Sequence, residues 1–185
     1  MKKILIVSGD PNSINSEIIY KSWIKLPKSI KKKIYIISNY NLLKEQFKIL
    51  NYSINILKVK SIFESAKSFD LKLIDIDMKF NNPFDVSKKV ASNFVLKSLN
   101  MAHKLALNKN VAGIVNCAIN KNLLIKNKIG VTEYLANKCN LKDDSYAMLI
   151  WNKKLSVCPI TTHIDLKEVS NKITTAKIIK KIKTI

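Results

Sequence analysis

The most constraining feature of this 185-residue sequence is a regular alternation of short apolar runs with amphipathic segments. Continuous apolar runs bounded by turn residues are typical of buried parallel strands, and apolar residues that recur every three or four positions are typical of helices. The sequence predicts strands at residues 3–7, 34–37, 54–57, 71–76 and 111–115, with helices at 16–26, 42–50 and 85–107. Such alternation indicates an α/β fold with a mostly parallel sheet flanked by helices.

Two segments carry more detailed predictions. Residues 71–76 alternate apolar with polar side chains, which predicts a strand with one wetter face. The long helical segment at residues 85–107 carries its apolar residues in one stripe, which predicts a core helix. Asp85 is in position to cap the N-terminus of that helix.

The last part of the chain has a different pattern. It predicts a helix at residues 131–140, a β-hairpin at 146–160 and a Lys-rich amphipathic helix at 173–185. We therefore expect a first α/β domain over residues 1–140 and the beginning of a second domain over residues 141–185.

Composition excludes several classes of protein. No apolar run approaches the roughly 18 residues needed to span a bilayer, and the N-terminal apolar stretch ends after Val7. We therefore expect a cytoplasmic protein without a membrane partner. The three cysteines are widely spaced and odd in number, so we expect reduced thiols rather than disulfides or a zinc knuckle.

The formal charge of +20 would ordinarily indicate a polyanionic partner. All the basic residues are lysine, however, and arginine is the residue that supplies bidentate contacts to phosphate and guanine. The lysines are scattered along the chain, and Lys, Asn and Ile are all heavily used, as expected when codons are rich in A and T. We therefore do not expect a nucleic-acid partner.

Glycine-rich binding motifs are missing from the sequence. With three glycines, the chain has no G-x-G-x-x-G, no phosphate-binding P-loop and no G-x-S-x-G. In a parallel α/β sheet, ligands bind in the crevice at the carboxyl ends of the strands. The functional residues are therefore expected in the loops that follow strands, at residues 8–17, 116–121 and 161–163.

These loops, with Gly130-Val131-Thr132-Glu133 between the second and third, resemble motifs of the 4-hydroxythreonine-4-phosphate dehydrogenase family of pyridoxal phosphate biosynthesis. The family patterns are approximately P-G-E-P-A-G-I-G-P-[DE], T-G-P-x-x-K, G-H-T-E and A-T-T-H-x-P-L. The resemblance covers nearly the whole chain but little more than half of a typical family member. It implies the fold shared with isocitrate and isopropylmalate dehydrogenases, which binds NAD without the Rossmann fingerprint.

The resemblance also implies roles for individual residues. His163 corresponds to a family histidine that ligates a divalent metal such as Zn, Mg or Co, and Thr132 to a threonine that contacts the substrate. Val131 stands where the family has a substrate-binding histidine. Lys121 matches the family lysine of the second loop, where its charge would attract the substrate phosphate. No catalytic residue is assigned.

The first two loops depart from the family patterns at several further positions. Asn12, Ser13 and Asn15 replace the alanine and the two following glycines of the first loop, and Asn116-Cys117-Ala118 replaces T-G-P. Nothing near Cys117 in the sequence would lower the pKa of its thiol, so we interpret it as a small spacer rather than a nucleophile.

The function implied by the resemblance is a metal-dependent, NAD-linked oxidation of 4-phosphooxy-L-threonine, followed by decarboxylation. It also implies a homodimer with a shared metal site. The family's other metal histidines lie in segments beyond residue 185, so we expect an N-terminal portion that is inactive alone. The departures leave an alternative open, a noncatalytic Lys-rich binding module derived from the same fold.

Overall fold

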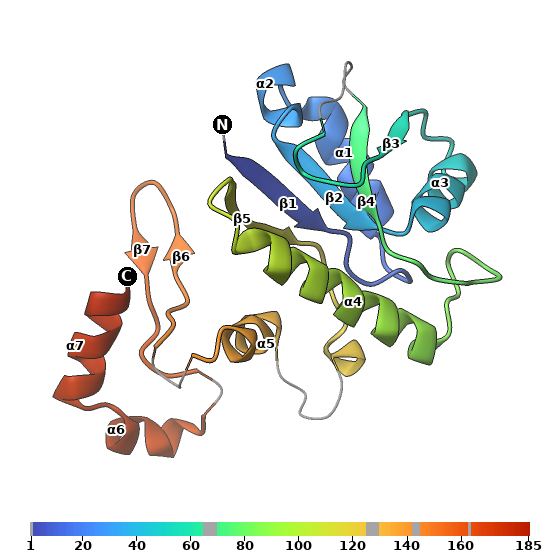
Figure 1. The fold of residues 1–185 in the computed structure, drawn as a ribbon. Coiled ribbons are helices and arrows are strands. Elements are labelled where there is room, and N and C mark those ends of the chain that lie inside the picture. Colours follow the sequence, from blue (N-terminus) through green and yellow to red (C-terminus); the bar gives the residue numbers. More distant parts are fainter. Residues whose placement is uncertain (1, 65–69, 125–129, 142–144, 163) are drawn as a thin grey trace. The chain divides into compact units, whose positions relative to one another are not determined.

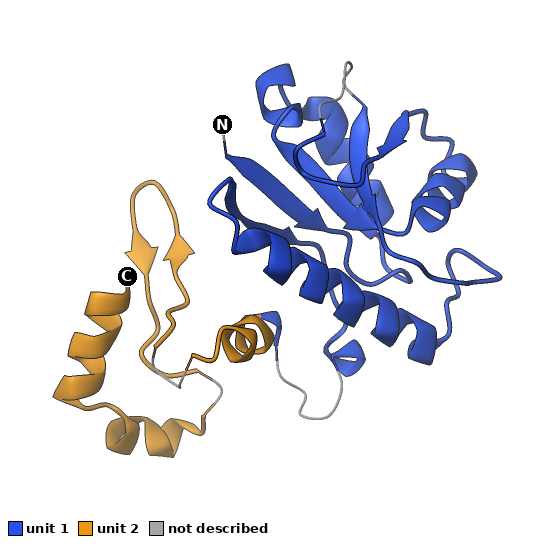
Figure 2. Ribbon diagram, in the orientation of Figure 1, with its two compact units in different colours: residues 1–131 blue, residues 132–185 orange. Residues whose placement is uncertain are grey.

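The computed structural model describes most of the chain, namely residues 2–64, 70–124, 130–141, 145–162 and 164–185. It divides into two compact units, Met1–Val131 and Thr132–Ile185 (Figure 2). The sequence placed the boundary after residue 140, whereas the structural division falls at the start of a helix.

Unit 1 is built on a five-stranded sheet in the order β3-β4-β2-β1-β5, in which all strand pairs are parallel (Figure 1). The strands are β1 (Lys3–Val7), β2 (Ile34–Ser38), β3 (Ile56–Lys58), β4 (Leu71–Asp75) and β5 (Val111–Asn116). This arrangement confirms the predicted α/β class with a parallel sheet. Strands β2, β3 and β4 all lie on one side of β1, and the chain then crosses to add β5 on the other side, so the strand order reverses between β1 and β5.

Helices cover both faces of this sheet (Figure 1). The helices of unit 1 are α1 (Asn15–Lys25), α2 (Lys28–Lys31), α3 (Tyr40–Ile49), α4 (Lys88–Ala106) and the 3₁₀ helix η1 (Lys121–Leu123). Helices α1 and α3 pack on one face, where Trp23 and Phe47 join a buried cluster with residues of β2 and β4. Each large apolar side chain buried in this way contributes about 1.5–3 kcal/mol.

Helix α4 lies across the other face and contacts β1, β2 and β5 (Figure 1). Its predicted apolar stripe, Ala91, Val95, Leu99, Ala102 and Ala106, is confirmed over its first four residues, which are fully buried, whereas Ala106 at its end is half-buried. The predicted cap is wrong. The helix begins after Ser87, which makes no side-chain capping bond, and the Asp85 amide instead donates to the Asn82 carbonyl in the preceding turn.

Lys72 of β4 contradicts the prediction of a wetter face, because this residue is only 4% exposed. Its Nζ donates to the Lys32 carbonyl at 2.6 Å and lies 4.3 Å from the centre of the Tyr35 ring. Burial, and secondarily the nearby charge of Lys3, lowers the pKa of Lys72 to about 8. A lysine can occupy this position because its long stem packs among apolar groups while the amine reaches a carbonyl.

The lowered pKa of Lys72 predicts a pH-dependent stability. Above a pH of about 8 the folded state loses this proton, whereas the unfolded chain keeps it up to about 10.5. The free energy of unfolding should therefore rise with pH across that window. We expect Lys72→Met to be more stable than the native chain at neutral pH by about 1–3 kcal/mol. By pH 10.5 the native chain should have become as stable as Lys72→Met in urea denaturation. A difference in the free energy of unfolding between the two proteins that stays constant with pH would contradict the prediction.

Unit 2 contains the predicted hairpin, although its paired strands are short. Strands β6 (Ile150–Trp151) and β7 (Ser156–Val157) are antiparallel. The helical elements at this end of the chain are α5 (Val131–Lys138), η2 (Leu166–Glu168), α6 (Val169–Lys172) and α7 (Thr175–Thr184). The hydroxyl of Thr174 caps α7 by accepting a hydrogen bond from the Lys177 amide at 3.2 Å. Across both units, every described helix is too short or too polar to cross a bilayer.

Candidate functional site

The loops that follow β1 and β5 are joined at the point where the strand order reverses. The side chain of Asn15 makes two hydrogen bonds to Ala118, accepting from its amide at 3.1 Å and donating to its carbonyl at 2.7 Å. The Asp10 amide also donates to the Ala118 carbonyl at 3.0 Å. The first two predicted loops therefore form one structural element at the carboxyl edge of the sheet.

Gly9 makes this close approach sterically allowed. Its φ of 76° lies in the left-handed region, which disfavours any residue with a Cβ. A Cβ added there would lie 2.4 Å from the Ala118 carbonyl oxygen and 2.7 Å from Nδ2 of Asn15. Glycine is therefore needed both for the backbone conformation and for the contact between the loops.

Two further amide side chains tie the first loop to its surroundings. Asn12 donates from Nδ2 to the Val86 carbonyl and accepts from the Val86 amide at Oδ1, both at 2.8 Å. The buried Gln46 donates to the carbonyls of Pro11 and Pro83 at 2.9 and 2.7 Å. Asn12 and Asn15 therefore hold the loop through side-chain bonds that the alanine and glycine of the family pattern cannot make.

A cavity of about 360 Å³ lies beside these loops in unit 1. It is lined by Asp10, Asn12, Lys88, Asn120, Asn122 and Leu123. Amide groups dominate this lining, and they can both donate and accept hydrogen bonds. The predicted residue Lys121 lies in η1 between two lining asparagines, and its side chain is exposed. The cavity has the position expected of a ligand crevice in a parallel sheet.

Cys117 follows β5 in this region and is a poor nucleophile. Its amide donates to the Val7 carbonyl at 2.9 Å, and burial raises the pKa of its thiol to about 11. The thiolate is the reactive form of cysteine, and it is scarce near neutral pH when the pKa is this high. The raised pKa supports the interpretation of Cys117 as a spacer, and Cys117, Cys139 and Cys158 are not disulfide-bonded in the structure.

This raised pKa predicts selective labelling of the cysteines. Iodoacetamide at neutral pH should alkylate the exposed Cys139 well before Cys117 in the folded protein. Mass spectrometry of tryptic peptides over time would give the two rates. In urea the rates should converge, and equal rates in the native protein would contradict the prediction.

A second cavity, of about 150 Å³, lies within unit 2 and unites two of the predicted motifs. Thr132 comes from the start of α5, and Thr161 and Thr162 come from the segment that follows the hairpin. All three line the cavity together with Glu133, Tyr146, Met148, Pro159, Ile160, Ile164, Lys172, Lys177 and Lys181. Residues some thirty positions apart in sequence thus meet at one site.

The lysines give this cavity a basic character. Lys181 is 8% exposed, its Nζ donates to the Tyr146 carbonyl, and it lies 5.3 Å from the centre of the Tyr146 ring. Lys172 and Lys177 also line the cavity, where Glu133 is the one carboxylate among the described lining residues. Ammonium and hydroxyl donors around a small cavity favour an anionic ligand.

Sequence reasoning anticipated Thr132 but missed these lysines. Lys177 and Lys181 are four positions apart on α7, so they share one face of the helix, which is the signal that could have identified them. Val131 is the half-buried first residue of α5 and does not line the cavity. The predicted metal ligand His163 lies outside the described residues.

The described residues do not supply a complete metal site. Among them, no group of three His, Cys, Asp or Glu side chains is arranged to hold a metal ion. A catalytic metal needs about three protein ligands, so the residues described do not fit such a site by themselves.

Comparison with known proteins gives a consistent result. Residues 30–185 match the family model described as pyridoxal phosphate biosynthetic protein PdxA. Curated relatives named 4-hydroxythreonine-4-phosphate dehydrogenase include one from Sulfurihydrogenibium sp. (strain YO3AOP1), 36% identical over 191 residues, and one from Aquifex aeolicus (strain VF5), 33% identical over 192 residues. Both alignments cover all of this chain and 57% of the relative's length.

Solved structures with similar folds carry the same name. The 4-hydroxythreonine-4-phosphate dehydrogenase of Klebsiella pneumoniae superposes with a TM-score of 0.84 at 25% identity, covering 99% of this chain and 57% of that one. The enzyme of Burkholderia phymatum gives a TM-score of 0.85 at 21% identity, covering 99% of this chain and 56% of that one. Since the family match extends over most of the sequence, this chain belongs to the PdxA family of pyridoxal phosphate biosynthetic proteins.

Proposed function

We propose that this chain forms the N-terminal portion of a 4-hydroxythreonine-4-phosphate dehydrogenase, which oxidises 4-phosphooxy-L-threonine with NAD before decarboxylation. The observation that carries the proposal is the cavity of unit 2, where Thr132 meets Thr161 and Thr162 among three lysines. The substrate is a phosphorylated amino acid, so its phosphate and carboxylate match the ammonium and hydroxyl groups of that lining.

In this proposal the residues of the chain bind and orient the substrate. The Thr132 hydroxyl donates a hydrogen bond to it, and Lys172 and Lys177 attract its negative charge. Asn12 and Asn15 keep the loops at the sheet edge in place, so that the cavity of unit 1 is available to the cofactor or substrate. Val131 offers only an apolar contact where the family has a histidine.

The metal and the cofactor belong to the same proposal. A divalent cation such as Zn, Mg or Co would stabilise negative charge on the substrate hydroxyl oxygen during oxidation. His163 is the residue of this chain that we propose as a ligand, and the other ligands would come from residues outside those described. We also propose a cytoplasmic homodimer with a shared metal site and no nucleic-acid partner.

Calorimetric titration of 4-phosphooxy-L-threonine into the purified chain tests this proposal. We expect binding that Thr132→Val and Lys177→Ala each weaken by about five- to ten-fold, because each variant removes one hydrogen bond or charge from the cavity. Thr175→Val, a substitution outside the cavity lining, serves as the matched control. NADH formation should be absent with the 185-residue chain alone. Binding that is equally strong in all three variants would contradict the proposal.

Another phosphorylated hydroxy acid is the main alternative substrate. A curated relative from Clostridium botulinum with the provisional name D-threonate 4-phosphate dehydrogenase is 26% identical over 181 residues. Val131 favours this alternative, since it removes a polar contact expected for the threonine derivative. Tighter binding of D-threonate 4-phosphate than of 4-phosphooxy-L-threonine in the same titration would assign the chain to that substrate.

The second candidate function is a noncatalytic Lys-rich binding module, favoured by the net charge of +20. Nucleic-acid binding that falls steeply with added salt would support it, because phosphate contacts release counterions. Salt-independent or undetectable binding would count against it.

A further inference from the structure

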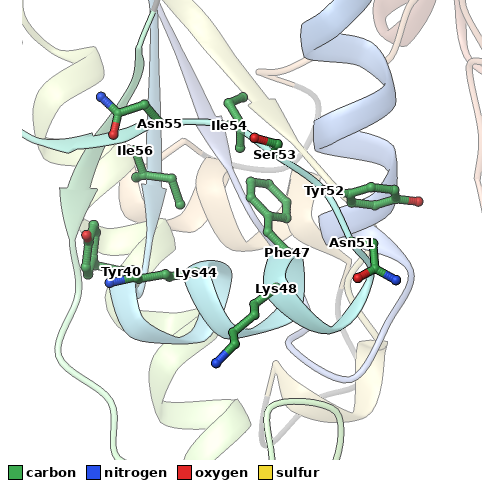
Figure 3. Close-up of a pocket in the computed structure, with 10 residues that line it drawn as sticks. All are labelled: Tyr40, Lys44, Phe47, Lys48, Asn51, Tyr52, Ser53, Ile54, Asn55 and Ile56. Atoms are coloured by element: carbon green, nitrogen blue, oxygen red, sulfur yellow. The ribbon is translucent and has the colours of Figure 1, made fainter.

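A third cavity lies at the opposite edge of the unit 1 sheet from the loops described above. It has a volume of about 570 Å³ and is bordered by α3 and by the segment 51–56 that leads into β3 (Figure 3). In the strand order β3-β4-β2-β1-β5, strand β3 is one edge and β5 is the other. The cavity is therefore separate from the candidate site at the ends of β1 and β5.

The lining of this cavity combines cations, amides and aromatic rings. It consists of Tyr40, Lys44, Phe47, Lys48, Asn51, Tyr52, Ser53, Ile54, Asn55 and Ile56. None of these lining residues is acidic. Figure 3 shows Tyr40 and Lys44 to one side of Phe47 and Tyr52 to the other. The volume falls within the range of about 300–1,000 Å³ that is usual for small-molecule sites.

The two lysines of this cavity differ from a neighbouring lysine in their ion pairing. Lys58 is paired with Asp75 at 2.8 Å, and its Nζ lies 4.5 Å from the centre of the Tyr40 ring. Lys44 and Lys48 are one turn apart on α3, and Nζ of Lys44 lies 5.8 Å from the centre of the Tyr40 ring. No salt bridge to either lysine is found among the described residues. Their charges are therefore available to an anion in the cavity.

The aromatic side of the cavity is held in place by packing. The rings of Tyr52 and Tyr20 stack with centres 4.0 Å apart and planes inclined by 2°. Phe47, which is 3% exposed, meets both tyrosines edge-on. The Tyr52 amide donates to the Phe47 carbonyl at 2.8 Å, which fixes the turn after α3. A ligand would thus meet a preformed wall, which lowers the entropic cost of binding.

We propose that this cavity binds a small aromatic phosphate monoester, that is, a planar ring that carries one phosphate group. Two lysine charges match the charge of about −1.5 to −2 that a phosphate monoester carries at neutral pH. The half-buried side chains of Tyr40, Tyr52 and Ile56 supply surfaces for the ring, and the buried Phe47 packs behind Tyr52. Asn51, Ser53 and Asn55 supply hydrogen bonds that orient the ligand. This inference is independent of the proposed dehydrogenase function.

Phenyl phosphate is the probe that tests the inference. Inorganic phosphate, which lacks the ring, and phenol, which lacks the phosphate, are the control ligands. Titration of each into the ¹⁵N-labelled chain, followed by amide chemical shifts, locates the binding. We expect phenyl phosphate to shift the amides of residues 44–56 with a dissociation constant of about 1 mM or lower. Inorganic phosphate and phenol should each bind at least about ten-fold more weakly.

Two double variants distinguish binding in this cavity from nonspecific attraction of an anion to the basic surface of the protein. Lys44→Ala/Lys48→Ala should weaken phenyl phosphate binding by about ten-fold. Lys97→Ala/Lys104→Ala removes the same charge from exposed positions on α4 and should leave the binding unchanged. Equal loss in both double variants, equal affinity for phenyl phosphate and inorganic phosphate, or no shifts in residues 44–56 would overturn the proposal. A stronger response to a glutamate-rich peptide than to phenyl phosphate would overturn it as well. If the chain does not bind 4-phosphooxy-L-threonine, the proposed function fails, but the expected binding of phenyl phosphate at residues 44–56 does not change.

Discussion

Replacing Gly9 by alanine is expected to lower the free energy of unfolding of unit 1 by about 2–4 kcal/mol. The residue has a φ of 76°, so an alanine there would be strained even in open space. The space is not open, since the new Cβ would lie 2.4 Å from the Ala118 carbonyl oxygen. Because that oxygen belongs to the backbone, a side-chain rotation cannot relieve the contact, and the loops must move apart.

The measurement is urea denaturation followed by the fluorescence of the buried Trp23, with the exposed Trp151 replaced by phenylalanine. The chain offers a matched control in Gly113 of β5, where an added Cβ would meet nothing within 4 Å. Gly113→Ala is expected to change the stability by no more than about 0.5 kcal/mol. A Gly9→Ala protein as stable as Gly113→Ala would mean that the two loops do not approach each other as described.

Replacing Asn15 by alanine is expected to cost about 2–3 kcal/mol, because it removes both side-chain bonds to Ala118. Asn15 is 3% exposed, so water cannot readily replace the lost partner. Asn15→Asp keeps the shape of the side chain but turns its donor toward Ala118 into an acceptor. It should therefore destabilise the chain at least as much as alanine does.

The control for this prediction is Asn93→Ala, at an exposed position on α4. It should change the stability by no more than about 0.5 kcal/mol in the same urea titration. An Asn15→Asp variant with native stability would show that Nδ2 makes no important bond, and the bidentate contact would have to be discarded.

Much of the fold of unit 1 was predictable from local pattern. The stripe from Ala91 to Ala102 repeats at helical spacing, and the structure buries each of its residues against the sheet. The runs at β1, β2 and β5 are apolar and bounded by turn residues, and all three are parallel strands. Such signals are reliable because periodicity and turn chemistry act over a few residues.

The two wrong predictions, for Lys72 and Asp85, share one feature, which is a hydrogen-bond partner far away in the sequence. Lys72 alternates with apolar neighbours as an exposed residue would, but a carbonyl of the segment after α2 gives its amine a buried partner. Asp85 has a capping side chain at a suitable place, yet Val86 exchanges two hydrogen bonds with the Asn12 side chain and the helix starts after Ser87. In both cases the partner lies at least forty residues away in the sequence.

The candidate sites likewise combine motifs that are visible in the sequence with contacts that only the fold creates. The motifs around Thr132 and Thr161 were visible as sequence, but their meeting in one cavity with Lys172, Lys177 and Lys181 was not. The metal role of His163 and the use of NAD stay predictions. The cavity at the β3 edge had no sequence signal, because its lining comes from a helix and a connecting segment with ordinary composition.

By itself the sequence determined most of the segments that are strands and helices, that the sheet is parallel, and that the candidate functional loops of unit 1 follow strand ends. These properties depend on residues close together in the chain. Only the tertiary structure decided which lysines are buried, which asparagines tie loops together and which side chains share a cavity. Burial and hydrogen bonding depend on the partners that the fold brings close, and those partners are distant in sequence.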